Sequence, residues 1–236
     1  MMVLKPNGHQ LDVLKGIALA AMCLDHLNTV FSWKSVELWM VGRMAFPVFA
    51  LVWGCNLSRH PVSQTSLNRL WLWAIAAQPV YWLALKGNGA AIFDLNILFA
   101  FAVAGQWVKG TQSSSLWSVL LAVALFLGYL PLSSLSYGLA GIVMLLASFG
   151  LFHVQTAERR WMMLTLWIAS VLALNASVGL IYALAGLLLS GMVWFAVMLT
   201  KTVQRDRFLP RHFFTLVYVG HLAVIGVMVW GMGIRS

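Results

Sequence analysis

Nine long apolar stretches follow one another along this chain of 236 residues, and only short polar or turn-forming segments separate them. A helix that crosses a bilayer needs about 20 mainly apolar residues, because each residue advances the helix by about 1.5 Å. Hydrophobic residues make up 61% of the chain and charged residues 9%, which is more apolar surface than a water-soluble core can bury. The predicted spans are 11–31, 38–58, 68–85, 92–109, 115–131, 135–152, 161–176, 178–199 and 212–232. The sequence therefore predicts an all-α fold, a polytopic membrane helical bundle of about nine transmembrane helices, with residues 1–236 as a single integral-membrane domain.

The orientation of this bundle follows from its Lys and Arg residues, which favour the cytoplasmic side of a membrane. Nine spans place the two ends of the chain on opposite sides. Eleven of the fifteen basic residues then fall on the side of the N-terminus, three fall on the other side, and Arg43 lies within a span. The asymmetry predicts a cytoplasmic N-terminus and a C-terminus outside.

The formal net charge of +9 has two interpretations. The basic residues are spread over several loops rather than along one helix or sheet, so nucleic acid is not the expected partner. One interpretation is that they set the topology and contact anionic lipid headgroups of the bilayer. The other is that some of them bind a phosphorylated donor, because the Arg fork suits phosphate oxygens. The candidates are Arg59, Arg69, Arg159, Arg160, Arg205, Arg207 and Arg211.

Several polar residues are predicted to lie at one depth, near the outer boundary of the bilayer. Asp25 and His26 come close to the end of the first span, and Arg43 follows the start of the second. An ionisable side chain in hydrocarbon costs about 2.5 to 3.5 kcal/mol on insertion scales, so it is expected to face a partner or a cavity. The other polar residues placed near this layer are Asn28, Asp94, Asn96, Ser136, Tyr137 and Asn175.

Asp25 and Arg43 are a natural ion pair between the first two spans. The pair is either a structural link or part of a site. Neighbouring residues on a helix diverge by about 100°, so Asp25 and His26 do not face the same partner squarely. If Asp25 turns to Arg43, His26 is left either to pack or to line a cavity. His221, midway along the last span, is either a proton relay or an interhelical hydrogen-bonding group.

The segment "GRMAFP" at 42–47 predicts a distorted helix. Pro47 has no backbone N–H, so the carbonyl of Arg43 loses its usual helical donor. Gly42 permits a close approach of another element beside that charge. Irregular backbone within a membrane is tolerated where it is buried in protein or lines a cavity, although proline kinks are also common in membrane helices.

Motifs of metal and nucleotide chemistry are absent from the sequence. No Cys and His residues have metal-ligand spacing, and neither a phosphate-binding loop nor a nucleophile elbow occurs. The sequence predicts no metal site.

Five segments of the chain resemble one known family. They are "DVLKGIALAAMCLDHLNTVF", "VGRMAFPVFALVWGCNLSRH", "LNRLWLWAIAAQPVYWLA", "NILFAFAVAGQ" and "LSYGLAGIVMLLA". These segments look like the TraX family of pilin acetylases from plasmid F-type conjugation systems. More distantly, the opening segment is similar to integral-membrane acyltransferases of the heparan-glucosaminide type.

The resemblance implies an activity. A member of this family is expected to move acetyl from acetyl-CoA to the N-terminal amine of the conjugative pilin subunit, in the bacterial inner membrane. The family's functional motif maps onto Asp25 and His26. The implied partners are the pilin and the lipid bilayer, and the implied co-substrate is acetyl-CoA.

Physical chemistry and resemblance together assign roles to the polar layer. An acceptor amine is protonated near neutral pH, and histidine, whose unperturbed pKa is near 6.5, suits the general base that frees its lone pair. We expect His26 to be this base, Arg43 and Asn96 to hold the thioester oxygen, and Asp25 to orient Arg43 or His26. The residues expected to bind the acceptor are Asn28, Asp94, Ser136 and Tyr137.

The donor and the acceptor lie on opposite sides in this hypothesis. The basic cytoplasmic loops would bind the phosphates of CoA, and a narrow tunnel would lead its pantetheine arm to His26. Direct transfer and a transient acetyl-histidine both remain open. The alternative class is a non-enzymatic membrane protein, either a small transporter or a pilin-docking factor.

Overall fold

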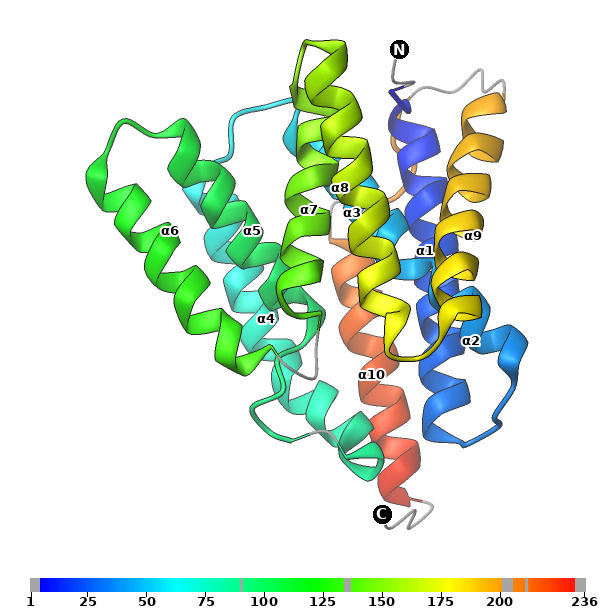
Figure 1. Cartoon of the computed structure of the whole chain (residues 1–236). Helices are drawn as coiled ribbons and strands as arrows, with labels where there is room; N and C mark the ends of the chain where they lie inside the picture. The colour runs from blue at the N-terminus through cyan, green and yellow to red at the C-terminus, as the bar shows by residue number, and fades with distance from the viewer. Residues whose placement is uncertain (1–4, 90, 134–136, 201–205, 211, 232–236) are drawn as a thin grey trace.

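In a computed structural model of the chain, which describes residues 5–89, 91–133, 137–200, 206–210 and 212–231, the regular structure is helical throughout (Figure 1). The all-α class predicted from the sequence is therefore confirmed for these residues. The helices are α1 (Gly8–Val30), α2 (Val36–Gly42), α3 (Ala45–Leu57), α4 (Gln64–Leu85), η1 (Lys86–Asn88), α5 (Ile97–Gln112), α6 (Leu116–Tyr129), η2 (Leu130–Leu132), α7 (Gly138–His153), α8 (Ala157–Ala176), α9 (Leu180–Leu199) and α10 (Phe213–Gly231).

Each predicted apolar stretch corresponds to a helix, and the second is divided into α2 and α3. Within the part of the chain that the structure describes, four units are long and apolar enough to cross a membrane: α1, the continuous segment Val36–Leu57, α9 and α10. The segment Leu116–Leu132 and α7 are apolar but shorter. The apolar helices support association with a membrane, and nine crossings remain a prediction.

The start of α1 is determined by local hydrogen bonds. Asn7 accepts the backbone N–H of Gln10, and the Gln10 side chain accepts the backbone N–H of Asn7, which is a complete capping box. The same Gln10 side chain donates to the carbonyl of Val197 at 3.0 Å. One residue thus begins the first helix and joins it to the end of α9.

The second apolar stretch breaks where the sequence predicts a distortion. Helix α2 ends at Gly42 and α3 begins at Ala45, so Arg43 and Met44 lie at the junction. Pro47 supplies no N–H to the Arg43 carbonyl, which weakens the helix at this point. A Cβ on Gly42 would lie 2.4 Å from the Asp25 carboxylate, so only glycine allows α1 to come this close.

The bundle is built around α1 and α3 (Figure 1). Helix α3 packs between α1 and α7, α8 and α9 continue from α7, and α10 lies against α4 and α1. Leu11, Leu14 and Val48 are fully buried in this core. Helix α6 packs on α5 at the edge of the bundle, and its outer face exposes large apolar side chains such as Trp117. Such faces suit contact with lipid.

Candidate functional site

The Asp25–Arg43 ion pair predicted from the sequence is present. Arg43 Nη2 donates to both carboxylate oxygens of Asp25, each at 2.9 Å. Nε and Nη1 of Arg43 make no hydrogen bond with any residue that the structure describes, and Nε is buried. The guanidinium therefore retains donors beyond those that bind Asp25.

The ion pair lines a cavity of about 220 Å³, which we call the polar cavity. Three tyrosines line this cavity: Tyr81 from α4, Tyr137 at the start of α7 and Tyr218 from α10. Asn175 at the end of α8 also lines it, and this side chain is 5% exposed. Asp25, His26, Arg43 and Tyr137, all predicted as site residues, thus meet around one space.

His26 lies in the wall of the polar cavity and binds a second histidine. Its Nδ1 is 2.9 Å from Nε2 of His221 on α10, and the two ring planes differ by 7°. His221 Nδ1 lies 3.1 Å from the carbonyl of Val217. The interhelical hydrogen bond expected of His221 is present, and its partner is the residue expected to be the base.

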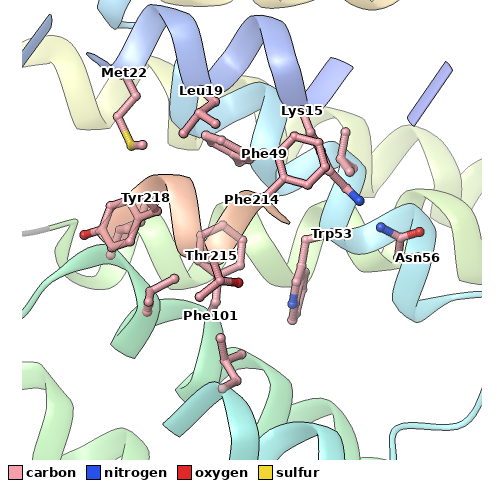
Figure 2. Close-up of a pocket in the computed structure, with 14 residues that line it drawn as sticks. Lys15, Leu19, Met22, Phe49, Trp53, Asn56, Phe101, Phe214, Thr215 and Tyr218 are labelled. Atoms are coloured by element: carbon pink, nitrogen blue, oxygen red, sulfur yellow. The ribbon is translucent and has the colours of Figure 1, made fainter. Parts of the chain in front are cut away.

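A second space, which we call the apolar cavity, adjoins the first. It has a volume of about 230 Å³ and is lined largely by apolar side chains, among them the aromatic Phe49, Trp53, Phe101 and Phe214 (Figure 2). Figure 2 shows Lys15 and Asn56 on one side of this space, and Met22 and Tyr218 on the other.

Both cavities share three lining residues, Met22, Ile97 and Tyr218. The apolar cavity therefore extends from Lys15, in the first half of α1, to the wall of the polar cavity that holds His26. A tunnel that runs from the basic loops to His26 stays a prediction.

Two arginines, Arg207 and Arg59, lie near the Lys15 side of the apolar cavity. Arg207 donates to the side chain of Asn56 at 2.8 Å, and Asn56 lines the cavity. Arg59 donates to the carbonyl of Pro6 and lies 3.4 Å from the sulfur of Cys55. Two of the seven predicted arginines are thus close to this end.

The other predicted arginines are placed differently. Arg69 lies 3.4 Å from the hydroxyl of Ser66 on its own helix. Arg160, in the first turn of α8, donates to the carbonyl of Val154, and Arg159 beside it is exposed. Arg205 and Arg211 lie outside the described residues.

Asp12 ties the connection before α10 to α1. Its carboxylate is 1% exposed and accepts the backbone N–H groups of Phe208 and Leu209 at 3.1 and 3.2 Å. Lys15 Nζ lies 3.5 Å from its other oxygen. This buried acid, which the sequence analysis did not single out, holds the segment that carries Arg207 beside the apolar cavity.

Asn96 has a structural position rather than the predicted one at the thioester oxygen. It is fully buried and caps α5 by accepting the N–H of Leu98. Its amide donates to the carbonyl of Ala74 and to Gln78, both at 2.8 Å. Both amide hydrogens are therefore used, and Asn96 does not line the polar cavity.

Two residues expected to bind the acceptor also hold local structure. The Asn28 amide exchanges two hydrogen bonds with the backbone of Ser35, which caps α2. The Asp94 carboxylate accepts the N–H of Ala91. Neither lines the polar cavity, and Ser136 lies outside the described residues.

The polar cavity also includes residues that the sequence analysis did not assign to the site. Asn175 was placed near the outer polar layer, but no role followed from its depth alone. Tyr81 and Tyr218 gave no signal, because single tyrosines in apolar helices are usual near membrane interfaces.

Comparison with known proteins gives one family. The family described as "TraX protein" matches residues 10–229. Protein TraX from Escherichia coli is 40% identical over 220 residues, which cover 93% of this chain and 87% of that protein. Protein TraX from Escherichia coli strain K12 is 39% identical over the same shares of both chains.

A more limited similarity points to another protein. A probable fimbrial assembly protein FimC of Dichelobacter nodosus is 36% identical over 104 residues, 39% of this chain and 42% of that protein. No solved structure matches this chain significantly.

Proposed function

Because this chain belongs to the TraX family, we propose that it is a membrane acetyltransferase that moves acetyl from cytoplasmic acetyl-CoA to the N-terminal amine of a conjugative pilin. One observation carries the proposal. An imidazole, an arginine with unused donors and a tyrosine-lined cavity meet at the end of a second, apolar cavity. The name of the fimbrial assembly relative is consistent with a pilus partner.

His26 is the proposed general base. It takes a proton from the acceptor amine, whose lone pair then attacks the carbonyl carbon of the thioester. As the C–N bond forms and the C–S bond breaks, the nitrogen loses a second proton, which goes to the departing thiolate, and His26 afterwards releases its own proton to solvent. The products are an N-acetyl group and CoA thiol. His26 is the imidazole that lines the polar cavity, and Asp25 is occupied by Arg43.

Arg43 is proposed to stabilise the oxygen of the thioester as it becomes negative. Donors directed at such an oxygen contribute strongly in a site that excludes water. Asn175 is proposed as the second donor to this oxygen, the role that was expected of Asn96. Its Nδ2 donates one hydrogen to the carbonyl of Val171, and the residue lines the cavity. Its second amide hydrogen is proposed to bind the oxygen.

Acetyl-CoA is proposed to reach the site through the apolar cavity. The pantetheine arm is narrow and largely uncharged, which suits an aromatic passage, and the phosphates would remain outside. Arg59, Arg207 and Lys15 lie at the end where those phosphates would bind. The bilayer is proposed to be the bacterial inner membrane, crossed about nine times, with the N-terminus in the cytoplasm.

The test is intact-mass spectrometry of the pilin co-expressed with this protein. The wild type should add the mass of one acetyl group to the pilin N-terminus, and His26→Ala should abolish the addition while the variant still inserts into membranes. Thr215→Trp, which fills the apolar cavity, should also reduce it. Leu216→Trp is the matched control, because Leu216 is 54% exposed on the neighbouring position of α10.

Two outcomes would contradict the proposal. A pilin that is never acetylated by the wild type would favour a transporter or a pilin-docking protein. Equal acetylation by the wild type and His26→Ala would remove His26 from the chemistry.

A further inference from the structure

Two histidines and one backbone carbonyl form a continuous chain of hydrogen bonds beside the polar cavity. The carbonyl of Val217 contacts Nδ1 of His221 at 3.1 Å, and Nε2 of His221 contacts Nδ1 of His26 at 2.9 Å. The two histidines are 195 residues apart in sequence. The carbonyl and His221 belong to α10, and His26 belongs to α1.

The carbonyl determines where each hydrogen lies. A carbonyl oxygen only accepts, so Nδ1 of His221 must carry the hydrogen of that contact. A neutral imidazole carries one hydrogen, so Nε2 of His221 is then a bare acceptor. The facing Nδ1 of His26 must donate to it. The remaining nitrogen of His26, Nε2, is left with its lone pair.

The surroundings suit two neutral rings. Among the described residues no carboxylate contacts either imidazole, because Asp25, the neighbour of His26, binds Arg43. The positive Arg43 also lines the cavity that His26 faces. Before an acceptor binds, a charged imidazole here would have no partner of opposite charge, so both rings are expected to start neutral.

The geometry directs the free nitrogen toward the cavity. A separation of 2.9 Å is shorter than van der Waals contact of stacked rings, and the planes differ by only 7°, so the two nitrogens meet in the plane of the rings. His26 lines the polar cavity and His221 does not. The edge of His26 opposite His221, which carries Nε2, therefore faces the cavity.

We infer that His221 is a positioning residue that holds His26 in the tautomer protonated on Nδ1 and so presents the bare Nε2 to the polar cavity. Its effect on rate rests on the proposed acetyl transfer, whereas the tautomer itself does not. In metal sites, removing the group that orients a ligating histidine lowers metal affinity or activity about 10- to 100-fold. We expect a similar fall in the acetylation rate when His221 is removed.

Two variants of His221 separate orientation from packing. His221→Phe keeps a ring of similar shape but removes the donor and the acceptor. His221→Gln keeps an amide that offers an acceptor to His26 and a donor to Val217. The acetylation rate should fall about 10- to 100-fold in His221→Phe, mainly in kcat, and should recover in large part in His221→Gln.

The tautomer is measured by ¹⁵N NMR of ring nitrogens in the histidine-labelled wild type, with His26 assigned by comparison with His26→Ala. Wild-type His26 should show a protonated Nδ1 and a bare Nε2. In His221→Phe the hydrogen should move toward Nε2, which a purely structural role would not cause.

A wild-type His26 protonated on Nε2 would overturn the inference, and so would an unchanged acetylation rate in His221→Phe. If the wild type acetylates no pilin, the proposed function fails while the NMR result still decides the tautomer.

Discussion

Arg43 shows how one side chain serves both structure and the proposed chemistry. One of its nitrogens binds both oxygens of Asp25, and the other donors are not bound by any residue that the structure describes. The similar predicted depths of Asp25 and Arg43 in the bilayer were enough to predict the ion pair, because ionisable side chains within a membrane pair with one another. The unused donors depend on where the guanidinium points.

We predict that Arg43→Lys separates these two functions. Lysine keeps the charge that pairs with Asp25 but lacks the planar group with several fixed donors. Loss of one such donor at a developing oxyanion costs about 10²- to 10³-fold in kcat. We therefore expect a large loss of pilin acetylation with a small change in thermal stability, measured in parallel on purified protein in detergent.

Arg43→Met is the comparison, since it also removes the charge beside Asp25. It should lower both the activity and the unfolding temperature. Full activity in Arg43→Lys would show that the guanidinium contributes only its charge.

Asn96 illustrates where residue-level prediction is weak. A polar residue at the predicted start of a span was assigned to a site, whereas its side chain caps α5 and binds Gln78. Asn is among the preferred residues at the first position of a helix, because its oxygen accepts an otherwise unpaired N–H. Depth alone does not distinguish a cap from a ligand.

At the level of helices, two glycines control how closely neighbouring helices approach, Gly42 at the end of α2 and Gly54 in α3. Gly42 gives Asp25 its space, and Gly54 lies against the backbone of α7. A Cβ at Gly54 would be 2.4 Å from the carbonyl carbon of Ser148. Backbone atoms move less easily than the end of a side chain, so α3 and α7 would have to separate.

We predict that Gly54→Ala lowers the free energy of unfolding by about 1 to 3 kcal/mol, the usual effect of overpacking. Gly191→Ala is the matched control, because nothing lies within 4 Å of a Cβ there on α9. That control should be neutral or stabilising, since alanine favours a helix by up to about 1 kcal/mol. The measurement is denaturation in detergent micelles, and equal stability of the two variants would contradict the packing described.

For the whole molecule, the positions of the first and last described helices can be compared with the predicted membrane topology. The start of α1 and the end of α10 lie at opposite ends of the bundle (Figure 1), as an odd number of crossings requires. The basic residues of the sequence favour the α1 end as the cytoplasmic one.

We predict that alkaline phosphatase fused after Gly231 is active in cells, because this enzyme matures only outside the cytoplasm. A fluorescent protein at the same position should be dark. Fusions at Gln155, in the turn between α7 and α8, should give the opposite pair of results. Phosphatase activity at Gln155 and none after Gly231 would reverse the orientation and place the polar cavity toward the cytoplasm.

The sequence by itself determined the helical class, the break near Pro47 and the pairing of Asp25 with Arg43. These follow from local chemistry: backbone groups in lipid must bond within a helix, proline lacks an N–H, and buried charges need partners. Only the tertiary structure decided that His221 faces His26, that Asn175 joins the cavity while Asn96 does not, and that two cavities adjoin. The direction of each side chain depends on how its helix is rotated about its own axis. Contacts between helices far apart in sequence set that rotation.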